Sequence, residues 1–115
     1  MGSLREVNLE LGMPAADAAV RRLTYEINHS RITGDAVLKI IHGYGSSGAG
    51  GRIRVEVRKY LERLKKRGDI AGFIPGERFS IFDPETLSAF RHCGDLRRDR
   101  DLERHNNGVT FILFQ

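Results

Sequence analysis

The fold is decided by residues 36–54, which read AVLKIIHGYGSSGAGGRIR. The first six positions form an apolar run rich in β-branched residues, which is typical of a strand covered on both faces. Five glycines follow among positions 43–51, and an amphipathic segment begins at Arg52. A strand that passes through a glycine-rich turn into a helix places His42 at the carboxyl end of the strand, where open α/β sheets hold their ligands.

The neighbouring segments predict the remaining elements. Residues 7–11 alternate as a half-buried strand, and apolar residues at helical spacing predict a helix that Gly34 ends. A second helix is predicted over 52–67, short strands over 70–74 and 78–82, a brief helix over 83–90 and a last strand over 109–114. This βαβα order followed by short strands predicts an α/β two-layer sandwich, with helices on a small, mostly parallel or mixed sheet. Five phenylalanines are expected in the core: Phe73, Phe79, Phe82, Phe111 and Phe114.

The composition narrows the class of protein. With 115 residues there is room for one domain, and no run approaches the roughly 20 apolar residues of a membrane span. The single cysteine, Cys93, predicts no internal disulfide and favours a cytoplasmic location. The formal net charge of +4 is a mild basic excess, compatible with a nucleic-acid partner.

The segment 91–107 differs from the rest of the chain because it is dense in charge. Between Arg91 and His105 it holds five arginines and four acidic residues. Such a balance predicts a mobile loop or a solvated helix, and it also suits a segment that docks a protein partner.

The glycine-rich turn predicts a phosphate site. Glycines let a bulky anion approach the main chain, and the free N–H groups of the following helix favour negative charge. Two alternatives stay open: a dinucleotide-binding fingerprint, Gly43-x-Gly45-x-x-Gly48 with Asp69 as its acidic residue, and a loop with no ligand. The predicted phosphate-binding residues are Gly43, Tyr44, Gly45, Ser46, Ser47, Gly48, Arg52, Arg54 and Arg58.

Three stretches resemble the Smr (small MutS-related) domain family. These are the strand ending in HGYG at 40–45, the helix at 52–61 and the strand GVTFIL at 108–113. The resemblance covers one domain over residues 5–115, leaving residues 1–4 as a tail or tag and about 76–107 as an insertion atypical of the family. It implies a βαβα sandwich that binds or nicks DNA or RNA, commonly structured or branched.

The first strand departs from the family pattern. The family's LDLHG motif, whose Asp and His are implicated in catalysis, is replaced by residues 8–12, NLELG. Depending on the alignment, these two positions hold Leu9 and Leu11 or Asn8 and Glu10. His42 is then the candidate catalytic residue, with Glu10 as a speculative partner. We therefore expect binding without cleavage, against the alternatives of a His42-dependent endonuclease and a protein-interaction module. No metal ligands or cofactors are predicted, and Mg²⁺ enters only if cleavage occurs.

Overall fold

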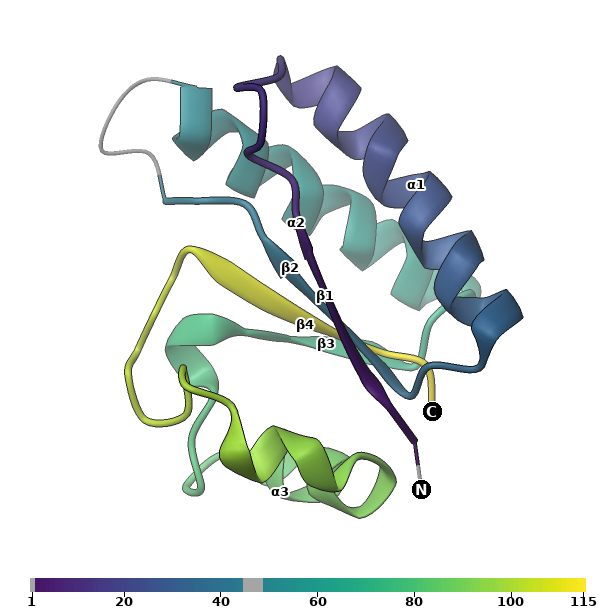
Figure 1. Ribbon diagram of the computed structural model, residues 1–115, viewed down its shortest axis with the longest axis vertical. Coiled ribbons are helices and arrows are strands. Elements are labelled where there is room, and N and C mark those ends of the chain that lie inside the picture. Colours follow the sequence, from purple (N-terminus) through teal and green to yellow (C-terminus); the bar gives the residue numbers. More distant parts are fainter. Residues whose placement is uncertain (1, 45–48) are drawn as a thin grey trace.

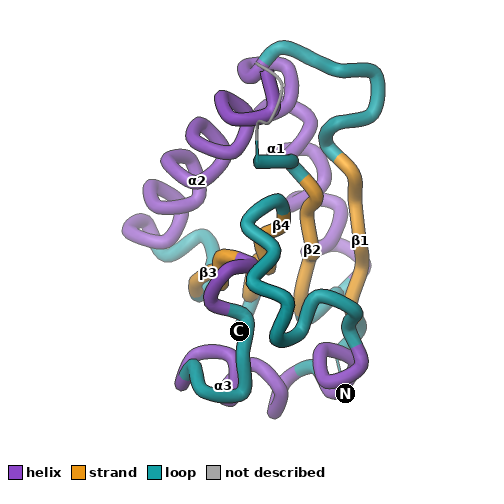
Figure 2. The backbone as a smooth tube through the Cα atoms, turned by 90° about the vertical axis from the view of Figure 1, so that its left-hand side faces the viewer, coloured by secondary structure: helices purple, strands orange, loops and turns teal. Residues whose placement is uncertain are grey.

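A computed structural model describes residues 2–44 and 49–115. Its centre is a four-stranded sheet in the order β1-β2-β4-β3, formed by Leu4–Asn8, Val37–Ile41, Val109–Leu113 and Gly72–Pro75 (Figures 1 and 2). The β1 and β2 strands are parallel, with Leu4 opposite Val37, whereas β4 runs antiparallel to both β2 and β3. The predicted α/β class with a small mixed sheet is confirmed.

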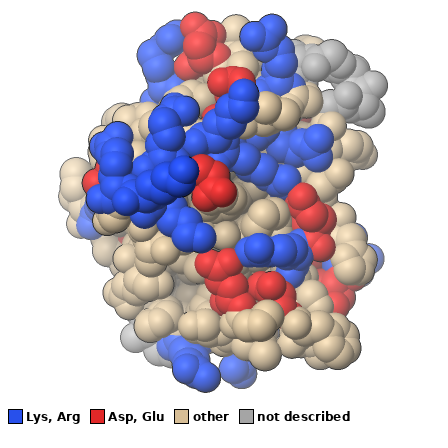
Figure 3. Space-filling model, turned by 180° about the vertical axis from the view of Figure 1, so that it is seen from behind, with Lys and Arg blue, Asp and Glu red and all other residues tan. Residues whose placement is uncertain are grey.

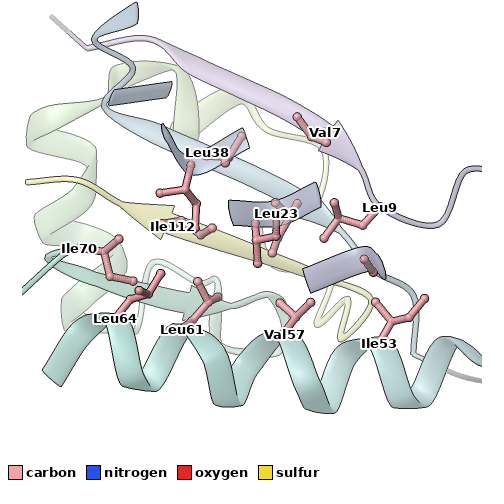
Figure 4. Close-up of a cluster of buried hydrophobic side chains, with 13 residues drawn as sticks. Val7, Leu9, Leu23, Leu38, Ile53, Val57, Leu61, Leu64, Ile70 and Ile112 are labelled. Atoms are coloured by element: carbon pink, nitrogen blue, oxygen red, sulfur yellow. The ribbon is translucent and has the colours of Figure 1, made fainter. Parts of the chain in front are cut away.

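Two long helices cover one face of the sheet (Figure 1). The α1 helix, Ala16–Thr33, ends at Gly34, whose φ of 80° is the left-handed conformation that glycine adopts at little cost. The α2 helix, Ala49–Arg67, packs beside it (Figure 1). Apolar residues at helical spacing meet the sheet in one core (Figure 4). Its buried members are Val7, Leu9, Ala19, Leu23, Ile27, Leu38, Ile40, Ile53, Val57, Leu61, Leu64, Ile70 and Ile112.

The opposite face is covered by the chain between β3 and β4. It forms η1 (Gly76–Arg78), α3 (Pro84–His92) and η2 (Gly94–Arg98). Phe79 packs on Phe111 with ring centroids 4.1 Å apart, and Cys93 and Leu96 are fully buried. The prediction of a solvated segment over 91–107 is therefore wrong, since its few apolar residues anchor it to the sheet.

The structure departs most from two of the predicted strands. Residues 78–82 form no strand, because the backbone tightens at η1 and the Glu103 carboxylate accepts the Ile81 N–H at 2.6 Å. Phe82 is consequently 86% exposed, so its prediction as a core residue is wrong. The first strand spans Leu4–Asn8 instead of 7–11, because the Asn8 side chain accepts the Glu10 N–H at 2.8 Å and turns the chain.

A buried ion cluster fixes the 99–101 segment to the sheet. Lys39, in the middle of β2, is fully buried, with its Nζ 2.9 Å from both carboxylate oxygens of Asp99 and 2.6 Å from Asp101 Oδ2. Glu6 approaches the same Nζ at 3.6 Å and also pairs with Arg100 at 3.3 Å. The charged cluster thus replaces apolar packing at the centre of this face.

None of the helices in the described part of the chain combines the length and the hydropathy of a bilayer-spanning segment.

Candidate functional site

His42 follows β2 directly and lies inside the protein. Its Nδ1 is 2.7 Å from the Gly43 carbonyl oxygen and its Nε2 is 2.8 Å from Thr110 Oγ1. A carbonyl oxygen only accepts, so Nδ1 carries the proton and Nε2 accepts from the threonine hydroxyl. Burial lowers the pKa of His42 to about 4, and the nearby cations of Arg58 and Arg54 act in the same direction. At neutral pH the imidazole is therefore uncharged, with both nitrogens already bonded.

Arg58 ties α2 to the other end of this network. Its two terminal nitrogens donate to the two carboxylate oxygens of Glu77 at 2.8 Å each, and its Nε lies 3.3 Å from Thr110 Oγ1. Burial raises the pKa of Glu77, but the hydrogen bonds and charge of Arg58 outweigh it, so the net direction is downward. Arg58, predicted as a phosphate ligand, is thus already engaged in a bidentate internal pair.

Glu10 and Gly43 lie together beside His42. Gly43 has a φ of +75°, and a Cβ added there would overlap the Glu10 carboxylate. The backbone N–H groups of His42 and Gly43 both donate to the Gly108 carbonyl oxygen, at 2.9 and 3.0 Å. Within the described residues, Glu10 makes no hydrogen bond to the His42 ring. The positive φ favours glycine at position 43, whereas the exposed end of the Glu10 side chain can move away from an added Cβ.

Tyr44 is the exposed member of the predicted set, with 57% of its surface accessible. It borders an open depression formed with residues of the 100–107 segment. The predicted ligands Gly45, Ser46, Ser47 and Gly48 lie outside the described residues.

The predicted arginines Arg52 and Arg54 lie on different sides of α2, since two residues turn a helix by about 200°. Arg52 borders a groove with Asp17 and Arg21 of α1. Arg54 borders a second hollow with Lys59 and Phe73 on the β3 side. A single phosphate group cannot be clamped by both, so they mark two possible tracks along the helix.

The outward face of α2 is strongly basic. The helix holds eight Lys and Arg against two Glu, a net charge of +6 in a chain of net +4, so the remaining residues sum to −2. Figure 3 shows this gathering of Lys and Arg on one face, with acidic residues mainly below it. Among the described residues, five of these side chains have no ion-pair partner: Arg52, Arg54, Arg63, Lys65 and Lys66. The predicted phosphate-binding arginines lie in the N-terminal half of α2, but its basic side chains continue to the C-terminal end. We call this set the α2 surface: Arg52, Arg54, Lys59, Arg63, Lys65, Lys66 and Arg67.

Sequence reasoning missed three partners of this site. Thr110 bonds His42, Glu77 bonds Arg58, and Lys39 holds the 100–107 segment nearby. Nothing local in the sequence pairs residues so far apart. The one sequence signal that could have pointed to such a partner is the single lysine within the apolar run 36–41, because a buried cation needs a counter-charge.

Asp69, the acidic residue of the dinucleotide alternative, lies just beyond the C-terminal end of α2 and pairs with Arg67. A helix of 19 residues separates it from the glycine-rich turn, a rise of about 28 Å. The dinucleotide interpretation is therefore wrong.

A four-stranded mixed sheet with two helices on one face, and a strand running into a glycine-rich turn, places the chain among small α/β domains. The sequence matches no protein-family model and no curated protein. Among solved structures, it is similar to the crystal structure of the Smr domain of Thermus thermophilus MutS2, with a TM-score of 0.59 and 20% sequence identity. The match covers 96% of this chain and 98% of that one. The chain has the Smr-domain fold, as the sequence resemblance predicted.

Proposed function

We propose that this domain binds nucleic acid through the phosphate backbone, and that the α2 surface makes the contacts. The observation that carries the proposal is the distribution of charge: α2 has a net charge of +6, whereas the rest of the chain is net negative. Such a concentration of positive charge along one helix attracts a polyanion and neutralises its phosphates. The resemblance of the HGYG turn to Smr domains supports the same function.

Two substitutions distinguish whether the nucleic-acid backbone lies on the β3 side or on the α1 side of α2. We expect Arg54→Ala to weaken binding uniformly across sequences if the backbone lies on the β3 side, and Arg52→Ala to do so if it lies on the α1 side. Each lost phosphate contact lowers the slope of log affinity against log salt by about one. Fluorescence anisotropy with labelled DNA and RNA over a salt series measures both effects.

Arg91→Ala is the matched control, because Arg91 is an exposed arginine on α3, in the layer on the other face of the sheet. It removes the same charge away from the α2 surface. Unchanged affinity in both the Arg52→Ala and the Arg54→Ala proteins would refute the proposed surface.

We further propose binding without cleavage. His42 is neutral and bonded at both ring nitrogens, so a proton transfer to or from a phosphodiester first requires the ring to leave its pocket. Labelled single-stranded, duplex and branched DNA and RNA are expected to stay intact with Mg²⁺ on a denaturing gel. Cut products that the wild type forms and His42→Ala does not would instead establish an endonuclease.

A further inference from the structure

The depression beside Tyr44 has a different chemical character from the α2 surface. Its volume is about 650 Å³, within the range of roughly 300–1,000 Å³ for small-ligand pockets. It lies between the chain that follows β2 and the chain that precedes β4. The residues lining it are Tyr44, Arg100, Asp101, Arg104, His105, Asn106 and Asn107.

Tyr44 is held in place as an open aromatic surface. The edge of its ring rests on Gly108, where an added Cβ would lie 3.1 Å from Tyr44 Cδ1. The preceding residue, Gly43, donates its N–H to the Gly108 carbonyl oxygen at 3.0 Å. The ring is nevertheless 57% exposed. An exposed ring on a fixed backbone is suited to stacking on a nucleobase.

Two arginines and one acid, Asp101, border the ring, and Asp101 shares the Lys39 cation with Asp99 and Glu6. Arg104 makes no side-chain hydrogen bond or ion pair to the described residues and is exposed. Asp101 is paired with Lys39 at 2.6 Å and accepts from Asn106 at 2.9 Å. Arg100 is paired with Glu6 at 3.3 Å. Arg104 is therefore the cation that a phosphate beside Tyr44 would meet.

The backbone on either side of Arg104 is constrained. Glu103 and His105 have φ values of 65° and 53°, in the left-handed region that non-glycine residues seldom adopt. Glu103 is fixed there by its N–H, which donates to the Phe79 carbonyl oxygen at 3.1 Å, and by its carboxylate, which accepts from Ser80 at 2.9 Å. Backbone held in such a conformation is a recurring feature of ligand-binding positions.

We propose that this depression takes an unpaired base of single-stranded nucleic acid, stacked on Tyr44, with Arg104 on the adjacent phosphate. The inference rests on the proposed function, because the α2 surface supplies the remaining backbone contacts. Arg58, one turn along α2 from Arg54, donates to Thr110 at 3.3 Å, and Thr110 bonds the His42 ring at 2.8 Å. His42 is two residues from Tyr44, so α2 lies beside the end of β2 that leads to the depression, and a single-stranded nucleic acid can contact both. A base inside a duplex keeps its faces stacked on its neighbours and cannot occupy the site.

The test compares a labelled single strand of 12 nucleotides with a blunt duplex of the same sequence, by anisotropy. Tyr44→Ala is expected to weaken single-strand binding by about 5- to 150-fold, the equivalent of 1–3 kcal/mol per stacked base. Tyr44→Phe retains the ring and is expected to bind within about 2-fold of the wild type. Duplex affinity is unchanged in both variants. Arg104→Ala lowers the salt slope by about one for the single strand alone.

Tyr25→Ala is the matched control, since Tyr25 is an exposed tyrosine on α1, 65% accessible and stacked on His29. The inference is overturned if Tyr44→Ala weakens single-strand and duplex binding equally, or weakens neither. If Arg54→Ala nevertheless weakens the binding of both probes, the proposed function stands. If the wild type binds neither probe with salt-sensitive affinity, the proposed function fails and the inference fails with it.

Discussion

Lys39→Met is expected to lower the free energy of unfolding by about 3–5 kcal/mol at pH 7. The substitution keeps the length of the side chain but leaves the carboxylates of Asp99 and Asp101, whose side chains are 6% and 11% exposed, without their buried cation. Burial raises the pKa of Asp101, and the hydrogen bonds of Lys39 and Asn106 reverse that direction in the wild type. Without Lys39, the effect of burial on the pKa of Asp101 is opposed by the hydrogen bond of Asn106 and the charge of Arg100. A domain of this size has a total stability of roughly 5–15 kcal/mol, so the loss is a large fraction.

Urea denaturation followed by far-ultraviolet circular dichroism measures the loss. Lys59→Met is the control, because Lys59 is 65% exposed, and its pair with Glu56 at 3.7 Å is expected to contribute less than about 1 kcal/mol. Adding Asp99→Asn and Asp101→Asn to Lys39→Met is expected to restore most of the stability, since no buried charge remains. A Lys39→Met protein as stable as the Lys59→Met control would show that the cluster contributes no net stability.

The second large effect is a loss of stability in mild acid that depends on His42. The pKa of His42 is lowered by burial to about 4, whereas in the unfolded chain it is about 6.5. Between these two pH values the unfolded chain binds the proton and the folded protein does not, so stability falls as the pH falls. The gap between pKa 6.5 and about 4 corresponds to about 3 kcal/mol, at roughly 1.36 kcal/mol per pH unit.

His42→Gln removes the titrating group and retains an amide that can bond Thr110. We expect its unfolding free energy to vary less between pH 6.5 and 4 than that of the wild type, in urea titrations at each pH. Asp35, Glu77 and Asp101 have lowered pKa values, so their stabilisation is lost at still lower pH and is common to both proteins. Parallel pH profiles for the two proteins would mean that His42 titrates normally and is open to solvent.

The sequence predicted the fold where periodicity reports burial directly. The apolar run 36–41 became β2, and the spacing of Leu23 and Ile27 became the core face of α1. The prediction failed where a side chain bonds a distant residue. Residues 78–82 alternate like a strand, but Glu103 captures the backbone there and leaves Phe82 in solvent. Charge density alone predicted a solvated segment at 91–107, because composition cannot show that Lys39 pairs with Asp99.

The site was predicted only in part for a related reason. The HGYG pattern places His42 at the end of β2, but the pattern does not tell which way the ring turns. That direction is set by Thr110 of β4, which pairs with Ile40 of β2. Thr110 lies 68 residues further along the chain than His42. The basic character of α2 was evident from the sequence, whereas the neighbours of Arg52 on α1 and of Arg54 near β3 could be identified only once the helix was placed on its sheet.

The position of β4 has a consequence for how the protein acquires its structure. This strand lies between β2 and β3, and all five of its residues are buried. In the sheet, β3 pairs with β4 alone, so it has no partner until residues 109–113 are in place. The local β1-α1-β2 unit can assemble early, but closing the sheet joins segments far apart in the chain, and such closure slows folding. We therefore expect the pairing of β4 to be a slow step of folding, and until it occurs the edge of β2 and the whole of β3 are open to pairing with other chains.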